Sequence, residues 1–149
     1  MLTRTYRRVV AAHSSCAHLM NIINAFLIVT GSHYTEDFTY GILLNKLLIY
    51  ESHPWFELVE ILFEVILLAI TPLIIVSHGF IKKGDEKGIY MSVAADIAIV
   101  FLSVFYPLLC LALTGVVSPM LTFCVIQIAA YLVIAVASNL YFLKANYVI

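Results

Sequence analysis

Two carboxylates lie deep inside apolar stretches of this sequence, and they are the side chains best suited to do chemistry. Glu64 falls about two turns, roughly 10 Å by helical rise, into the apolar stretch that follows Pro54. Asp96 has a similar depth in the next apolar stretch, counted from the other side. A carboxyl group that is removed from water favours its protonated form, so both residues are candidates for binding and releasing protons. Glu57 and Glu60 precede Glu64 and are expected to be hydrated.

Three amide side chains could connect these two carboxylates. Asn21 and Asn24 lie in the first apolar stretch, and Gln127 lies in the fourth. One interpretation is a path for protons or cations between Glu64 and Asp96. The other is a set of structural contacts with amides, hydroxyls or a basic side chain of a partner chain, because no Lys or Arg lies in these stretches to pair with either carboxylate.

The polar residues of each apolar stretch recur at helical spacing. Such stripes should face the interior of a helix bundle or a protein neighbour, because polar groups are costly in lipid. In the fourth stretch the stripe is predicted to contain Gln127, Tyr131 and Ser138, with Asn139 outside it.

The histidines raise the possibility of a redox cofactor. A b-type haem needs two imidazoles on facing helices at matched depth, and His13 with His78 could provide them. His18 is a weaker candidate for the same role. No metal site is predicted, because no carboxylate except Asp96 lies at the same depth as these histidines.

Catalytic residues are not predicted. The sequence has no Ser-His-Asp ordering, no glycine-rich phosphate loop and no CxxC motif. Cys16, Cys110 and Cys124 fall in apolar stretches, where cysteine commonly behaves as a small hydrophobic residue. Whether Cys110 and Cys124 form a disulfide depends on geometry and stays open.

Composition defines the class of protein. Of the 149 residues, 63% are hydrophobic and 11% are charged, and the mean hydropathy is +1.03. Soluble domains carry about 25% charged residues, so this chain is expected to be an integral membrane protein with a single domain. The net charge of -1 argues against a nucleic-acid partner.

The sequence predicts an all-α membrane protein, a bundle of four transmembrane helices. A span needs about 20 apolar residues, and the segments that qualify are about 9–30, 56–77, 89–113 and 119–143. Between the first two, residues 35–50 or so have the spacing of an amphipathic helix that lies on the membrane surface.

Orientation follows from the basic residues, which concentrate on the cytoplasmic side of membrane proteins. One side carries Arg4, Arg7, Arg8, Lys82, Lys83, Lys87 and Lys144, and the other carries only Lys46. Both termini are therefore predicted to be cytoplasmic, or on the matrix side of an organelle inner membrane.

Three functions are compatible with these features. The first is a non-catalytic subunit that stabilises a larger membrane complex, for example an energy-converting one, with other membrane subunits and the lipid bilayer as partners. The second is a small proton- or cation-coupled transporter or channel that uses Glu64 and Asp96. The third is an electron-transfer subunit that binds b-type haem.

Overall fold

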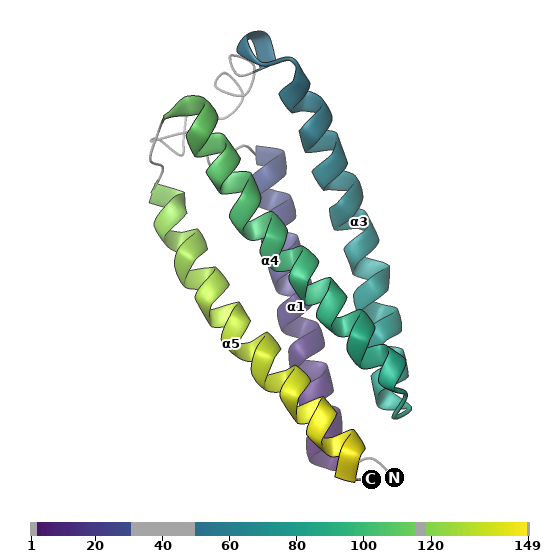
Figure 1. Cartoon of the computed structure of the whole chain (residues 1–149). Helices are drawn as coiled ribbons and strands as arrows, with labels where there is room; N and C mark the ends of the chain where they lie inside the picture. Colours follow the sequence, from purple (N-terminus) through teal and green to yellow (C-terminus); the bar gives the residue numbers. More distant parts are fainter. Residues whose placement is uncertain (1–2, 31–49, 116–118, 149) are drawn as a thin grey trace.

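Four long helices make up the fold. The computed structural model describes residues 3–30, 50–115 and 119–148. The helices are α1 (Arg4–Thr30), α3 (Trp55–Lys82), α4 (Glu86–Thr114) and α5 (Pro119–Val148) (Figure 1). Each contains a segment long and apolar enough to cross a membrane. This confirms the predicted all-α bundle of four membrane-spanning helices.

The helices are longer than the apolar segments that predicted them. The first begins at Arg4 rather than near residue 9, α3 continues to Lys82 and α5 to Val148. Apolarity marks only the part of a helix that matches the hydrocarbon layer, and the polar ends can continue as helix beyond it. The predicted surface helix at about 35–50 lies almost entirely outside the described residues.

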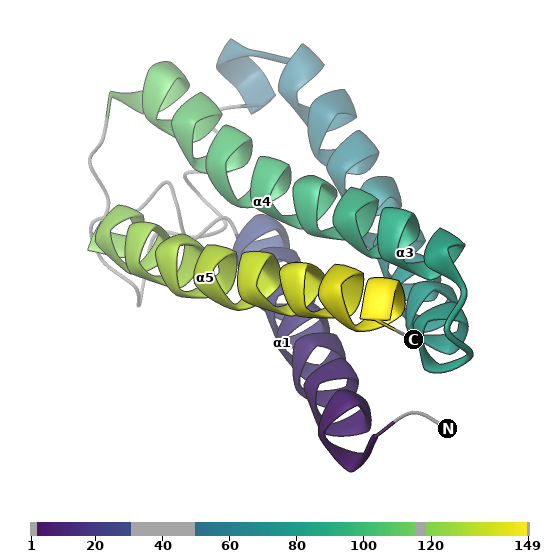
Figure 2. The same cartoon turned by 60° about the horizontal axis from the view of Figure 1, so that its bottom comes forward.

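The helices form a ring in the order α1, α3, α4, α5, with α1 and α4 also in contact across the centre. Neighbouring helices in the chain run in opposite directions, so the N-terminus, the C-terminus and the α3–α4 turn lie at one end (Figures 1 and 2). We call this the termini end of the bundle. The arrangement makes α1 and α4 the two helices whose side chains meet all the others.

Local signals define the tight turn between α3 and α4. Gly84 has a φ of 76°, a left-handed conformation that glycine adopts without steric cost. The Asp85 side chain then accepts a hydrogen bond from the Lys87 backbone N–H at 2.9 Å and caps the start of α4. The two helices therefore leave the turn as a closely packed antiparallel pair.

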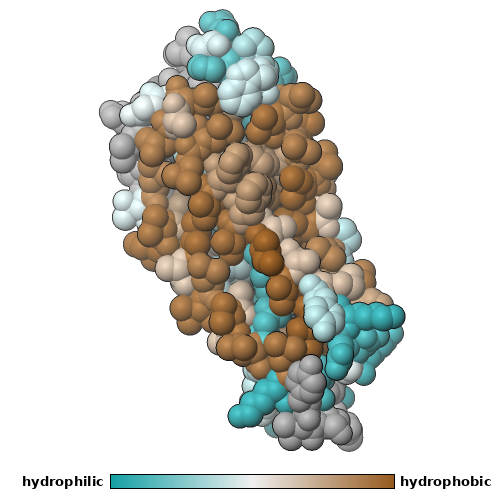
Figure 3. Space-filling view, viewed as in Figure 1, coloured by the Kyte–Doolittle hydropathy of each residue, from teal (hydrophilic) through white to brown (hydrophobic). Residues whose placement is uncertain are grey.

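The face of the bundle seen in Figure 3 is mostly apolar along its middle, with hydrophilic residues at both ends. Large hydrophobic side chains on every helix are exposed, among them Ile22, Leu68, Ile97 and Val133. All Lys and Arg residues of the described segments are exposed as well, and none enters the interior. The interior polar groups must consequently find their partners among uncharged side chains, histidines and the backbone.

Gly88 allows α3 and α4 to approach closely beside this turn. A Cβ atom at Gly88 would lie 2.6 Å from the Ile81 backbone nitrogen and 2.7 Å from the Ser77 carbonyl oxygen, whereas one at Gly79 would meet nothing within 4 Å. We expect Gly88→Ala to lower the free energy of unfolding in detergent by about 1–3 kcal/mol, because backbone atoms must move. Gly79→Ala is the matched control and should cause no loss. Equal effects of the two substitutions would contradict this account of the crossing.

Candidate functional site

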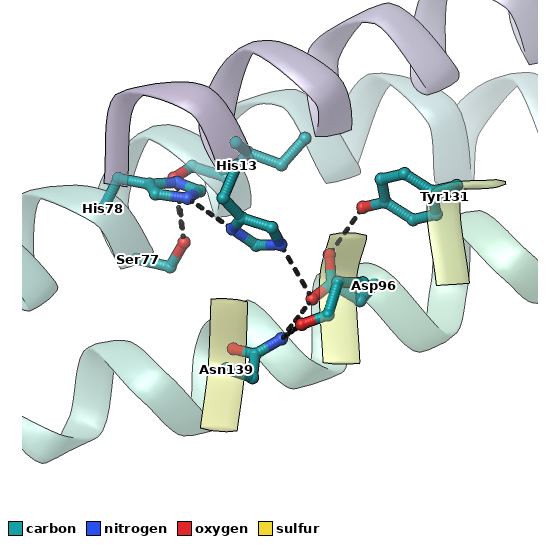
Figure 4. A network of polar contacts seen from close by, with 8 residues as sticks. His13, Ser77, His78, Asp96, Tyr131 and Asn139 are labelled. Atoms are coloured by element: carbon teal, nitrogen blue, oxygen red, sulfur yellow. Dashed lines mark hydrogen bonds and ion pairs between the residues drawn. The ribbon is translucent and has the colours of Figure 1, made fainter. Parts of the chain in front are cut away.

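Three buried side chains form a hydrogen-bonded chain across the bundle. His78 of α3 contacts His13 of α1, with 2.9 Å between His78 Nε2 and His13 Nδ1. The other ring nitrogen of His13, Nε2, lies 3.1 Å from Asp96 Oδ2 on α4. Figure 4 shows His13 between its two partners. The chain thus links three helices through groups that can all exchange protons.

The fourth helix, α5, supplies two donors to the same carboxylate. The Tyr131 hydroxyl donates to Asp96 Oδ1 at 2.5 Å, and Asn139 Nδ2 donates to Asp96 Oδ2 at 2.7 Å (Figure 4). Asn139 Nδ2 also donates to the Ala135 carbonyl oxygen at 2.9 Å. Asp96 is therefore the point at which α1, α4 and α5 are joined by polar contacts.

The contacts of His78 determine which of its nitrogens holds a proton. His78 Nδ1 lies 2.6 Å from the Ile74 carbonyl oxygen, which can only accept a hydrogen bond. The Ser77 hydroxyl donates to the same carbonyl at 2.8 Å. Nδ1 must therefore bear a hydrogen, and in a neutral His78 ring Nε2 is then an acceptor.

It follows that His13 donates from Nδ1 to His78 Nε2. The remaining contact, between His13 Nε2 and Asp96 Oδ2, also needs one proton, which is held either by an imidazolium paired with a carboxylate or by a carboxylic acid paired with a neutral imidazole. In both forms the total charge of the three side chains is zero. The geometry thus corresponds to an electroneutral state that has one proton shared between His13 and Asp96.

Because the three side chains are buried, the shared proton determines whether the interior carries a net charge. His13 is 1% exposed, His78 4% and Asp96 7%, and no Lys or Arg of the described segments is buried. An uncompensated charge in such a place would cost several kcal/mol. The proton keeps the group neutral, and its loss would leave a negative charge inside the bundle.

Two further polar layers lie between this group and the other end of the bundle. Asn24 accepts a hydrogen bond from the Ser103 hydroxyl at 3.0 Å and donates to the Ile99 carbonyl oxygen at 3.3 Å. Asn21 donates to the Leu67 carbonyl oxygen at 3.0 Å and to the Thr71 hydroxyl at 3.1 Å. Both predicted amides on α1 are thus interior groups that bridge to α3 and α4.

Glu60, rather than Glu64, is the buried carboxylate of α3, so the prediction that Glu60 is hydrated and Glu64 buried is wrong. Glu60 is 2% exposed and accepts hydrogen bonds from the hydroxyls of Tyr50 and Tyr106. Burial, together with the hydrogen bond to Glu60, raises the pKa of the Tyr50 hydroxyl above its usual value, which keeps this donor protonated. Glu57 is exposed, as predicted.

Glu64 is half-buried and lies at a groove between α1 and α3. The groove has a volume of about 350 Å³ and is also lined by Asn21 and Thr71. Asn21 Oδ1, although buried, has no hydrogen-bond partner among the described residues. The half-buried Glu64 carboxylate therefore lies at a groove that opens toward the outside of the bundle, next to the buried Asn21 side chain.

The other predicted residues fall outside the hydrogen-bonded chain. His18 and Gln127 are half-buried, and Gln127 Oε1 is a buried atom with no partner in the described segments. Asn139, which the predicted stripe omitted, instead binds Asp96. Its spacing of eight residues from Tyr131 turns only about 80° around the helix, so a broader stripe would have included it. Cys110 and Cys124 are free thiols.

The two histidines that the haem prediction named contact each other directly in this structure. His13 and His78 come together at one depth, as that prediction requires, but their nitrogens contact each other directly at 2.9 Å. Iron would need to lie between the two rings at about 2 Å from each nitrogen. All four ring nitrogens are engaged by protein groups. Neither histidine presents a free ligand atom in this arrangement.

Comparison with models of known protein families, with curated proteins and with solved structures finds no match to this chain. The fold and composition define the class, a multi-pass membrane protein. Its function has to be inferred from the interior polar groups themselves.

Substitution at Glu60 tests the assignment of the buried carboxylate. We expect Glu60→Leu to lower the free energy of unfolding by about 1–3 kcal/mol, because two tyrosine hydroxyls lose an acceptor. Glu57→Leu, one turn nearer the start of α3 at an exposed position, should change it by less than about 0.5 kcal/mol. The measurement is reversible unfolding in mixed detergent micelles. A larger loss for Glu57→Leu would contradict the assignment.

Proposed function

We propose that this protein is a small proton-coupled membrane transporter in which Asp96 binds the coupled proton. The supporting observation is the buried chain from His78 through His13 to Asp96, whose contacts require one shared proton. Uncharged amides and hydroxyls could make similar contacts between helices, whereas these groups can also exchange a proton.

The coupling follows from charge. When the shared proton leaves, Asp96 becomes a carboxylate whose nearest described partners are neutral donors, Tyr131 and Asn139. The described interior contains no Lys or Arg that could balance this charge. A cation from outside the protein can balance it, and a returning proton would displace that cation. One site can in this way bind either a proton or a monovalent cation, but not both.

The histidines give the proton a short route to water. His78 precedes the end of α3 at Lys82 by four residues, about 6 Å by helical rise. His13 can pass a proton between Asp96 and His78 by exchanging which of its nitrogens bears hydrogen. In the proposed orientation the termini end faces the cytoplasm or matrix, as the basic residues at that end favour.

Toward the opposite end of the bundle, further polar residues lie on the same face of α4 as Asp96. Ser103 and Tyr106 follow Asp96 by seven and ten residues, and Tyr106 reaches the Glu60 carboxylate. The step from Asp96 to Ser103 is about 10 Å by helical rise, too long for a direct hydrogen bond. In the proposed cycle, water or a change of helix packing bridges this step, and Glu60 takes the place that the sequence had suggested for Glu64.

A second function, a subunit of a larger membrane complex, is favoured by the groove at Glu64. Asp96 and Glu60 are satisfied within the chain, whereas Glu64 has no hydrogen bond or ion pair among the described residues. The Glu64 carboxylate is an acceptor at a groove that opens toward the outside of the bundle and that Asn21 and Thr71 also line. A basic side chain on a helix of another subunit would complement this carboxylate.

Proton coupling can be measured with purified protein in liposomes that hold an imposed pH gradient. We expect wild-type protein to collapse the gradient when one member of a panel of monovalent inorganic and organic cations is added. Asp96→Asn should slow this collapse at least tenfold, because the amide cannot bind the exchanged proton. Glu57→Gln, which changes an exposed carboxylate, should leave the rate unchanged. A rate for Asp96→Asn equal to that of wild type would exclude Asp96 as the coupling residue.

The native mass of the protein in its own membrane tests the subunit hypothesis. After extraction in mild detergent, a subunit should run with other polypeptides at a mass well above 16.7 kDa. Glu64→Gln should then release it from them, whereas Glu57→Gln should not. A monomer or homo-oligomer in the wild type would leave the transporter as the supported function.

A further inference from the structure

A cavity between α4 and α5 reaches the proposed proton site from the side of the bundle. Its volume is about 540 Å³, within the usual range for small-molecule sites. Asp96 and Asn139 contribute the polar part of its lining, and apolar side chains such as Ile97, Phe101, Leu132 and Leu140 form the walls. Figure 3 shows a narrow hydrophilic strip between the apolar surfaces of these two helices.

The cavity opens on the surface that faces lipid. The wall residue Ile97 is 64% exposed and Leu140 is 60% exposed, and both belong to the apolar exterior of the bundle. A molecule dissolved in the hydrocarbon layer could therefore enter sideways, without crossing an aqueous vestibule. The apolar part of such a molecule would exchange contacts with lipid for contacts with these walls. This exchange costs little free energy, because neither environment contains water.

The polar part of the cavity offers acceptors and no free donors. Both hydrogens of Asn139 Nδ2 are used, toward Asp96 Oδ2 and the Ala135 carbonyl oxygen. This fixes the orientation of the amide and leaves the buried Asn139 Oδ1 without a partner in the described segments. The Asp96 carboxylate can accept about four hydrogen bonds and receives three. A ligand that suits this lining must donate hydrogen bonds, and a positive charge adds to the attraction.

We infer that the cavity between α4 and α5 binds a lipophilic amine in its protonated form. The ammonium head donates to Asp96 and to Asn139 Oδ1, and the apolar body lies between Ile97, Phe101 and Leu140. The inference rests on the proposed function, because it names the class of cation that is exchanged for the proton at Asp96.

The exchange is balanced in charge. An ammonium ion entering from the bilayer brings one positive charge to Asp96, and the proton shared with His13 leaves through His78 to water at the termini end. Rebinding of a proton restores the contact between His13 and Asp96 and releases the ammonium ion. No covalent bond forms or breaks apart from the transfer of this proton between nitrogen, oxygen and water.

Other ligand classes fit the lining less well. Quinones, carboxylates and phosphates present acceptor oxygens, which would face the acceptors Asp96 Oδ1 and Asn139 Oδ1 without a hydrogen between them. A hydrated metal ion needs several oxygen ligands, whereas the walls are aliphatic and aromatic. An alcohol can donate but brings no charge to balance the carboxylate.

The test is direct binding to the full chain in lipid nanodiscs, with empty nanodiscs subtracted. Octylamine is the probe, and octanoate and 1-octanol are controls with the same apolar body. We expect saturable binding of octylamine at one site per chain, with release of about one proton per bound amine in a weakly buffered solution. Octanoate should not bind in this way, and 1-octanol should bind at least tenfold more weakly than octylamine.

Two substitutions locate the site. Ile97→Trp fills the cavity from an exposed position that does not disturb the interior, and it should weaken octylamine binding at least tenfold. Ile75→Trp is the matched control, because Ile75 is 59% exposed on α3 and is not part of this cavity. Asp96→Asn should abolish the proton release. The inference is overturned if no saturable binding exceeds that of empty nanodiscs, if octanoate binds as tightly as octylamine, or if the two Trp variants bind equally.

The two proposals can fail separately. If sodium or potassium ions collapse the pH gradient through Asp96 while octylamine does not bind, the inference is wrong and the proton-coupled function stands. If octylamine binds and Ile97→Trp blocks it, but Asp96→Asn leaves gradient collapse unchanged, the site stands and the proton-coupled function is wrong.

Discussion

The structure depends on one proton, held between His13 and Asp96. Asp96 is where α1, α4 and α5 make polar contact, and His13 extends that contact to α3 through His78. With the proton present, both ring nitrogens of each histidine and both oxygens of Asp96 have a partner, and the net charge of these three side chains is zero. A bundle whose exterior resembles the lipid around it has little hydrophobic force to hold its helices together. Interior polar contacts therefore have a large share in fixing how these four helices pack.

The same constraint explains the distribution of charge. Every described Lys and Arg is exposed, and all of them lie near the termini end of their helices. The interior carboxylates are compensated by hydroxyls, amides and imidazole, which are neutral or can become so. Groups of this kind can change protonation without breaking a permanent ion pair, whereas a carboxylate fixed by an arginine stays charged. The described interior therefore contains no ion pair with Lys or Arg that a change of protonation would break.

Much of the fold could be predicted from the sequence, and less of the site. The lengths of the apolar segments alone identified four spans, because a helix needs about 20 apolar residues to cross the hydrocarbon layer. Asp96, Asn21 and Asn24 were recognised as interior groups, since each is polar within an apolar segment. The sequence did not predict that Glu60 rather than Glu64 is buried. That depends on the Tyr50 and Tyr106 hydroxyls reaching the Glu60 carboxylate from other segments. Asn139 was missed because a narrow helical stripe excludes a side chain at the edge of the buried face.

The tight turn between α3 and α4 has a consequence for how the protein enters a membrane. Insertion of α4 alone would place Asp96 in hydrocarbon before Tyr131 or Asn139 could reach it, and insertion of α3 alone would do the same with Glu60. The turn at Gly84 and the close crossing at Gly88 let the two helices enter as a hairpin, in which Tyr106 already bonds to Glu60. During synthesis α1 is made before Asp96 emerges, so His13 is in place when α4 arrives. Only α5 remains to be inserted, and its Tyr131 and Asn139 donate the last two hydrogen bonds to the Asp96 carboxylate.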